Sequence, residues 1–217
     1  MEKESLIPDD HREQVRSEFN EKLQNPVKII MFTQQIECQF CAETRQLINE
    51  IAALNDRITV EIYDFVADAE KAKHLGIEKI PALAIMGEKD HGIRFYGFPY
   101  GYELRTLIDG VILASRGTTD LSEDTKGKLR QITVPIHIQV FVTLTCPHCS
   151  TAASMAYQFA VENSLIRADV IEANEFPHLA LQYGVMGVPK IVVNEKIEFV
   201  GAVLENLFLE QVLLATH

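Results

Sequence analysis

The four cysteines of this chain constrain its fold most, because they stand in two pairs of identical spacing. Cys38 and Cys41 form one Cys-x-x-Cys pair, Cys146 and Cys149 form the other, and the first members lie 108 residues apart in a chain of 217 residues. Because this distance is almost half the chain, it indicates that a unit of 108 residues occurs twice. The cysteine positions therefore predict two similar domains rather than one.

Two further segments repeat at the same offset. Gly76-Ile-Glu-Lys-Ile-Pro81 aligns with Gly184-Val-Met-Gly-Val-Pro189, so each proline follows the first cysteine of its unit by 43 residues. The β-branched segments 58–63 and 166–171 align as well. One such match could arise by chance, but a register shared by three motifs indicates a duplicated fold.

The hydrophobic periodicity of each unit predicts an α/β fold. Each cysteine pair follows an apolar, β-branched run typical of a central strand and precedes apolar residues at helical spacing. A second strand, a short helix ending at a glycine, a hairpin and a last helix follow, and an amphipathic helix stands in front. The predicted strands are 27–32, 58–63, 82–86, 92–96, 136–142, 166–171, 190–193 and 196–200, and the predicted helices are 10–23, 42–54, 102–114, 122–131, 151–162 and 203–215, with short ones ending at 76 and 184. We therefore predict two tandem units, residues 1–116 and 117–217, each with a central mixed four-stranded sheet flanked by helices.

Charge and composition exclude several classes of protein. With 20 basic and 31 acidic residues the chain carries a net charge of −11, so it lacks the basic surface of a nucleic-acid or anionic-membrane binder. Residues 1–10 are charged and hold no apolar run of the length of a signal peptide or a membrane span. We therefore expect a cytoplasmic protein, and in a reducing compartment paired cysteines indicate metal binding or redox catalysis.

A Cys-x-x-Cys pair at the junction of a strand and a helix suits redox chemistry. The first sulfur lies beside the unpaired backbone N–H groups of the helix N-terminus, whose positive partial charge favours thiolate over thiol. A free cysteine titrates near pH 8.5, and this setting brings the pKa to about 3.5–7.5. The second cysteine lies one turn further on and can attack a mixed disulfide formed on the first.

The residues between the cysteines differ between the two pairs. Pro147 fixes φ at a first-turn position that needs no N–H, and a cationic His148 near the sulfur would favour the thiolate further. A stabilised dithiol makes the disulfide a stronger oxidant, so we predict that Cys146/Cys149 is the more oxidising pair. Gln39 and Phe40 are neutral and predict a more reducing pair. In the alternative interpretation His148 points to solvent and has little influence.

The Ile80-Pro81 and Val188-Pro189 bonds are the next candidate site residues. An X-Pro bond at the start of a strand can be cis, and a cis proline packed against the cysteines would expose the backbone of Ile80 or Val188 to pair with an extended substrate. The alternative is an ordinary trans proline at a strand start. The same position in both units favours the functional interpretation.

Taken together, the cysteine pairs and the prolines resemble the motifs of a known fold. A Cys-x-x-Cys pair after a first strand, with Ile-Pro or Val-Pro following, resembles the thioredoxin/glutaredoxin fold. Two such units with both pairs intact, together with the segments Gly92-Ile-Arg-Phe-Tyr-Gly-Phe-Pro-Tyr-Gly101 and Val185-Met-Gly-Val-Pro-Lys-Ile-Val192, resemble the protein disulfide oxidoreductases of thermophilic archaea and bacteria. The resemblance covers nearly the whole chain.

The resemblance implies dithiol–disulfide exchange on protein substrates, with reductase and oxidase activity and isomerase activity as a further expectation. It implies that Cys38 and Cys146 are nucleophiles, that Cys41 and Cys149 resolve, and that the redox-active disulfides serve without a separate cofactor or metal. Electrons are expected from a flavin-containing, thioredoxin-reductase-like partner, with a peroxiredoxin as a further candidate partner.

Two features depart from thioredoxin itself. The chain has no tryptophan, so the Trp-Cys-Gly-Pro-Cys signature is absent. Thioredoxins also carry a buried aspartate six residues before the first cysteine, whereas here those positions hold Phe32 and Val140. The sequence therefore leaves the group that moves the proton unidentified.

Three alternatives stay open at this stage. The thiols could bind zinc, although the two pairs are much farther apart than the knuckles of a structural zinc site, or an iron–sulfur cluster shared between glutaredoxin-like units of two chains. The chain could be a dedicated electron-transfer module of a peroxide-reducing system, as in the amino-terminal part of the alkyl hydroperoxide reductase flavoprotein. Finally, the cysteines could be buried and inert in an interaction protein.

Overall fold

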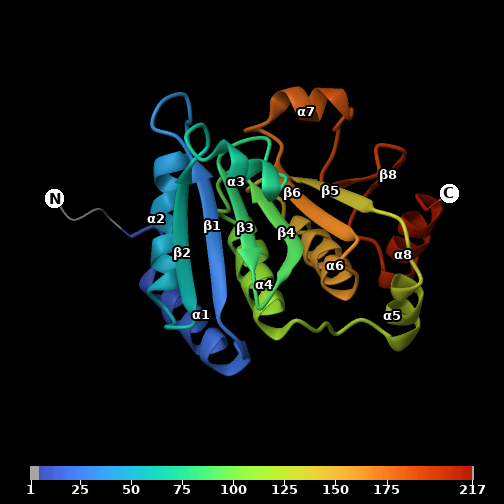
Figure 1. The fold of residues 1–217 in the computed structure, drawn as a ribbon, viewed down its shortest axis with the longest axis horizontal. Helices are drawn as coiled ribbons and strands as arrows, with labels where there is room; N and C mark the ends of the chain where they lie inside the picture. Colours follow the sequence, from blue (N-terminus) through green and yellow to red (C-terminus); the bar gives the residue numbers. More distant parts are fainter. Residues whose placement is uncertain (1–4, 217) are drawn as a thin grey trace.

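A single eight-stranded sheet runs through the whole molecule, with helices on both of its faces (Figure 1). The computed structural model describes residues 5–216. Residues 1–4, which belong to the charged start considered above, and residue 217 therefore lie outside the described residues, as do the outer limits of the two predicted units. Among the helices of the described part, none is both long enough and apolar enough to cross a membrane.

The predicted elements are all found in the predicted order, with ends that shift by a few residues. The first unit contains α1 (Asp9–Lys22), β1 (Val27–Thr33), α2 (Cys41–Ala52), β2 (Ile58–Asp64), α3 (Ala69–His74), β3 (Ala82–Met86), β4 (Asp90–Tyr96) and α4 (Glu103–Arg116). The second contains α5 (Glu123–Arg130), β5 (Ile136–Val142), α6 (Cys149–Glu162), β6 (Ile166–Glu172), α7 (Pro177–Gln182), β7 (Lys190–Val193), β8 (Ile197–Val200) and α8 (Glu205–Leu214). The helices after the cysteine pairs begin slightly earlier than predicted, at the second cysteine itself.

Local sequence signals explain several element ends. The chain leaves α3 through Gly76 and α7 through Gly184, whose φ angles of +67° and +54° lie in the left-handed region that glycine adopts most easily. The side chain of Ser122 caps α5 by accepting a hydrogen bond from the backbone N–H of Thr125 at 3.2 Å.

Strand pairing repeats between the two units as the duplicated sequence predicts. In the first unit β1 pairs in parallel with β2 and antiparallel with β3, and β3 pairs antiparallel with β4. In the second, β5 pairs in parallel with β6 and antiparallel with β7, and β7 pairs antiparallel with β8. Each unit therefore has the mixed four-stranded sheet that the sequence predicts.

The join between the units was not predicted. Strand β4 pairs in parallel with β6, with Ile93 opposite Ala168 and Tyr96 opposite Ile171, so the two sheets become one. The burial of the two hairpin strands explains the difference. Five of the seven residues of β4 are buried and none is exposed, as in a strand paired on both edges, whereas exposed residues alternate along β8, the free edge of the sheet.

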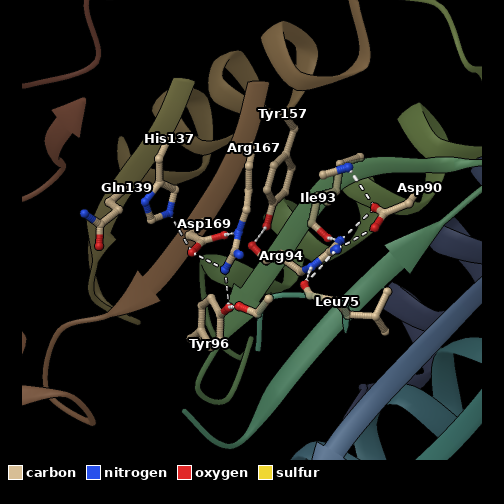
Figure 2. Close-up of polar contacts among 12 residues, drawn as sticks. Leu75, Asp90, Ile93, Arg94, Tyr96, His137, Gln139, Tyr157, Arg167 and Asp169 are labelled. Atoms are coloured by element: carbon tan, nitrogen blue, oxygen red, sulfur yellow. Dashed lines mark hydrogen bonds and ion pairs between the residues drawn. The ribbon is translucent and has the colours of Figure 1, made fainter. Parts of the chain in front are cut away.

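A polar network around the buried carboxyl group of Asp169 lies across this join (Figure 2). Arg167 donates to Asp169 at 2.7 Å and to the hydroxyl oxygen of Tyr96 at 2.7 Å, and His137 Nε2 lies 2.8 Å from Asp169. Burial acts to raise the pKa of Asp169, but His137 and Arg167 outweigh it and hold that pKa at about 2. Because Tyr96 belongs to β4 and the other three to β5 and β6, the network links the two units.

The helices divide unequally between the faces of the sheet. The larger apolar cluster lies between the sheet and the long helices, with Phe19 of α1, Leu107 of α4, Phe159 of α6 and Phe208 of α8 among its members. The smaller cluster lies under the short helices α3 and α7. The long helices α2 and α6, which begin at the cysteine pairs, thus pack on the more heavily covered face.

Candidate active site

The structure places each cysteine pair where a strand passes into a helix. Cys41 and Cys149 are the first residues of α2 and α6, and Cys38 and Cys146 end the loops that come from β1 and β5. Both pairs form disulfides, with a Cα–Cα distance of 5.5 Å in each. The first sulfur of each pair therefore lies at a helix N-terminus, where partial positive charge stabilises a thiolate.

Within each pair the first cysteine is the more accessible. Cys38 is half-buried and Cys41 is buried, and the side chain of Cys146 is 8% exposed whereas that of Cys149 is 0% exposed. An incoming disulfide therefore meets Cys38 or Cys146 first. The second cysteine is shielded from solvent and positioned to react with its neighbour.

The candidate prolines come directly before β3 and β7, and the second of them lies beside its cysteine pair. The Ile80-Pro81 and Val188-Pro189 bonds are cis. The carbonyl oxygen of Val188 lies 3.8 Å from Cys146 Sγ, and Ile80 packs against the same apolar cluster as Cys38. In the second unit the structure thus brings together Cys146 and Val188, a residue predicted to bind substrate.

The residues between the cysteines differ in their surroundings. Pro147 and His148 are both exposed, with His148 at the N-cap position of α6. Phe40 instead stacks on Phe98 with a centroid distance of 6.0 Å, and Phe98 stacks on Tyr100 at 5.2 Å. The first pair therefore lies beside a row of aromatic rings, and the second lies beside solvent.

A buried carboxyl group near the second pair was missed by the sequence analysis. Glu103, the first residue of α4, is fully buried, and one of its oxygens accepts a hydrogen bond from Thr106 at 2.7 Å. Its other oxygen has no hydrogen-bond partner among the described residues. A buried, half-satisfied carboxyl group is unfavourable for folding, so it is a candidate for a functional group.

The register of α4 against α6 places Glu103 at the level of Cys149. A Cβ added to Gly110 of α4 would lie 3.3 Å from Cε2 of Tyr157 in α6. Glu103 precedes Gly110 by seven residues and Cys149 precedes Tyr157 by eight. Because each helical residue advances about 1.5 Å and both helices start at the same end of the sheet, Glu103 lies beside the first turn of α6.

Two more carboxyl groups lie at this end of the sheet. Glu172 ends β6 opposite Val142, the last residue of β5, and Glu175 accepts a hydrogen bond from the backbone N–H of Phe98 at 2.7 Å. Burial raises the pKa of Glu103 and of Glu175 to about 7. The negative charge of nearby Glu172 raises both of these pKa values further, and burial raises the pKa of Glu172 itself. Glu103 can therefore accept or return a proton near neutral pH.

The first unit has a different acid at the position that corresponds to Glu172. The matching residue at the offset of 108 residues is Asp64, which is half-buried and accepts hydrogen bonds from the backbone N–H groups of Val66 and Ala67. Phe32 and Val140 are fully buried apolar residues, as their sequence positions suggest. Glu103 was missed because it comes from the first unit yet lies at the second pair, so no alignment of the two units reveals it.

Metal binding, one of the alternatives that the sequence leaves open, needs several ligand side chains close together. Within residues 5–216 there is no group of three or more His, Cys, Asp and Glu side chains arranged to hold a metal ion.

Comparison with known proteins identifies relatives for one unit and for most of the chain. A thioredoxin domain model matches residues 136–214. The thioredoxin of Methanocaldococcus jannaschii is 33% identical over 78 residues, which is 36% of this chain and 92% of that thioredoxin. The F component of the alkyl hydroperoxide reductase of Escherichia coli is 25% identical over 178 residues, covering 82% of this chain and 32% of that component. This chain therefore spans about a third of the length of that relative.

A solved structure matches both units together. The protein disulfide oxidoreductase of Aeropyrum pernix superimposes with a TM-score of 0.88 at 29% sequence identity, covering 95% of this chain and 92% of that one. The tandem arrangement and the joined sheet are thus shared with a known structure over nearly their full length. The chain belongs to the thioredoxin family, as a member in which two thioredoxin-like units stand in tandem.

Proposed function

We propose that this protein is a thiol–disulfide oxidoreductase that acts on protein substrates through two Cys-x-x-Cys sites. The observation that carries the proposal is the geometry of the pairs. Each is a disulfide at a helix N-terminus in which the first cysteine is more exposed than the second. Likeness to the protein disulfide oxidoreductase of Aeropyrum pernix supports the same activity. The units proposed to carry the sites are residues 1–116 and 117–217.

In the reducing direction, Cys146 reacts first. Its thiolate attacks one sulfur of a substrate disulfide, forms a mixed disulfide and releases the other substrate sulfur as a thiolate. The Cys149 thiolate then attacks Cys146, closes the Cys146–Cys149 disulfide and releases the second substrate thiolate. Two electrons pass to the substrate, and oxidation follows the same steps in reverse. Cys38 and Cys41 have the same roles in the first unit, so neither site requires a further redox group.

Glu103 supplies the proton transfer that the second step needs. A buried cysteine is a poor nucleophile while it holds its proton, because only the thiolate attacks. We propose that Glu103, directly or through one water molecule, accepts the proton of Cys149 and later returns it. The pKa of about 7 fits this role near neutral pH. The backbone of Val188 pairs with the substrate chain beside Cys146, and that of Ile80 does the same beside Cys38.

The partners follow from the proposed activity. A thioredoxin-reductase-like flavoprotein is proposed as the electron donor and a cytoplasmic location as the site of action, since a reducing compartment keeps such thiols in use. The match to the F component of alkyl hydroperoxide reductase over 82% of this chain favours a second candidate function, delivery of electrons to a peroxiredoxin.

Trapping the mixed disulfide tests the proposal. A Cys149→Ser variant, reduced and mixed with a disulfide-containing protein such as insulin, should accumulate a covalent adduct at Cys146 that mass spectrometry locates. The reduced parent should cleave the same substrate without accumulating the adduct. Absence of both cleavage and adduct would contradict the proposal. Faster reaction with an oxidised peroxiredoxin than with insulin would favour the second candidate function.

A further inference from the structure

A buried lysine at the end of the loop that faces Cys146 also contacts the start of that loop. Residues 183–189 connect α7 to β7, and Lys190 is the first residue of β7. Its ammonium donates to the carbonyl oxygen of Tyr183 and, at 3.4 Å, to that of Gly184, and it pairs with Glu198 at 2.7 Å. Lys190 is only 7% exposed. We call these contacts the Lys190 clamp.

In the first unit a different cation donates hydrogen bonds to the corresponding carbonyl group. Leu75 matches Tyr183 at the offset of 108 residues, and its carbonyl oxygen accepts hydrogen bonds from Arg94 Nε at 3.2 Å and Nη2 at 3.1 Å (Figure 2). Arg94 is buried and pairs with Asp90 at 2.6 Å. Both units thus hold the end of their short helix with a buried, ion-paired cation.

The two cations do not occupy matching positions in the repeat. Arg94 lies in β4, whereas Lys190 lies in β7, where the first unit has Ala82 at the same offset. Carbonyl groups at a helix C-terminus lack partners within the helix, and hydrogen bonds from a charged donor are stronger than neutral ones. Two independent solutions at one position indicate that both units need this helix end held in place.

Val185 of the second loop packs against the smaller apolar cluster, but the next two residues have little to hold them. A Cβ added to Gly187 would meet no atom within 4 Å, and the side chain of Met186 is 97% exposed. In the first unit, Ile77 is buried and Lys79 packs over the ring of Tyr96 with its Nζ 4.0 Å from the centroid. The second loop therefore depends more on its clamp.

From these contacts we propose that Lys190 is a positioning residue for the second redox site. By holding Tyr183 and Gly184 next to its own backbone, Lys190 fixes both ends of the loop and keeps the carbonyl group of Val188 beside Cys146 Sγ, at the observed 3.8 Å. Arg94 has the same role at the first site. The inference rests on the proposed function, because it assigns the loop to the docking of a protein substrate.

Lys190→Met tests the proposal, in a background in which Cys38 and Cys41 are serine so that only the second pair reacts. We expect the KM for a protein disulfide to rise about tenfold while kcat changes less than about twofold, since loss of charged hydrogen bonds frees the loop but leaves the thiols intact. Turnover of a small disulfide such as hydroxyethyl disulfide should stay within about twofold, because it needs no loop. Lys190→Arg should have a KM close to that of the parent, because arginine keeps the charged donor. Lys196→Met, which changes an exposed lysine of the same hairpin, should behave as the parent.

Hydrogen exchange gives a second measurement that does not depend on activity. Backbone amides of residues 184–188 in the oxidised variant should exchange about tenfold faster than in the parent, and Glu198→Gln, which removes only the ion pair, should give a smaller change in the same direction. Parent-like KM and parent-like exchange in both variants would overturn the clamp. If the parent itself turns over no protein disulfide, the proposed function fails, and exchange at residues 184–188 still decides whether Lys190 holds the loop.

Discussion

The two cysteine pairs occupy the same position in a repeated unit, yet their surroundings differ. Phe40 of the first pair stacks on Phe98, and the residue that matches Glu172 there is the half-buried Asp64. The second pair has exposed Pro147 and His148 between its cysteines, and the buried acid Glu103 lies at the level of its helix start. The duplicated fold therefore provides the thiols, and residues that differ between the two copies distinguish the surroundings of each pair.

The loops that precede the two prolines also differ between the units, in the exposure of their side chains. The first carries Glu78 and Lys79, and Lys79 packs over Tyr96. The matching positions of the second are the fully exposed Met186 and Gly187, whose surroundings are open. An exposed apolar side chain and an accessible backbone suit contact with a polypeptide substrate. Because of this difference and the proposed role of Glu103, we expect the second pair to carry most of the activity.

The largest expected effect comes from removing one nucleophile at a time. Cys146→Ser should reduce the turnover of a protein disulfide by roughly a thousandfold at that site, because serine does not form a comparable nucleophile at neutral pH. Cys38→Ser should retain most of the turnover. Steady-state reduction of insulin by the two variants measures the difference, and the reverse order of activities would show that the first pair is the main site.

Glu103→Gln tests whether a residue of the first unit serves the second pair. General acid–base groups contribute about 10²- to 10⁴-fold, so we expect the rate at the second pair to fall by about 10²-fold. In the parent this rate should rise as pH increases through about 7, because only ionised Glu103 accepts a proton. The variant should lack that rise.

Glu205 provides a matched control for this experiment, since it begins α8 as Glu103 begins α4. Glu205→Gln should leave the rate and its pH dependence within about twofold of the parent. Equal losses in the two variants, or a step at pH 7 that survives in Glu103→Gln, would remove Glu103 from the mechanism.

The same substitution should change stability in a pH-dependent way. Burial raises the pKa of Glu103 to about 7 from 4.5, so the folded protein binds this proton more tightly than the unfolded chain does. The stabilisation is complete below pH 4.5 and is lost as pH rises through 7. Glu103→Gln cannot ionise and does not lose this stabilisation. As pH rises through those limits, its free energy of unfolding should therefore increase by about 3 kcal/mol relative to that of the parent. Urea unfolding at pH 5 and pH 8 measures the gain, and a constant difference would contradict the raised pKa.

Much of the fold was predictable because its signals are local. Apolar β-branched runs gave the strands, and Gly76 and Gly184 marked the helix ends through their left-handed backbone. The offset between the cysteine pairs gave the repeat and, with it, the corresponding positions of Pro81 and Pro189. Each of these depends on residues close together in the sequence or on a comparison of the unit with itself.

The remainder depends on contacts between the units, which a repeat does not encode. The pairing of β4 with β6 joins different elements of the two copies. Its one sequence signal is that the segment 93–96 is apolar except for Arg94. Glu103 could be taken for an ordinary acidic residue in the first turn of a helix. Its proposed role depends on the packing of α4 beside α6 and on the burial of its carboxyl group, which the sequence does not reveal.

The smallest expected effect concerns the residues between the cysteines, which the sequence predicts to make the second pair the more oxidising. Replacing Pro147 by Gln and His148 by Phe gives the second pair the composition of the first. We expect its reduction potential to fall by about 30 mV, a tenfold change in the dithiol–disulfide equilibrium, because the stabilised thiolate loses its neighbours. Redox titration of each pair, in a background with the other pair changed to serine, measures the shift. Since His148 is exposed, an unchanged potential would mean that the helix N-terminus alone stabilises the thiolate of Cys146. Any functional difference between the two pairs would then depend on Glu103 and on the loops before the prolines.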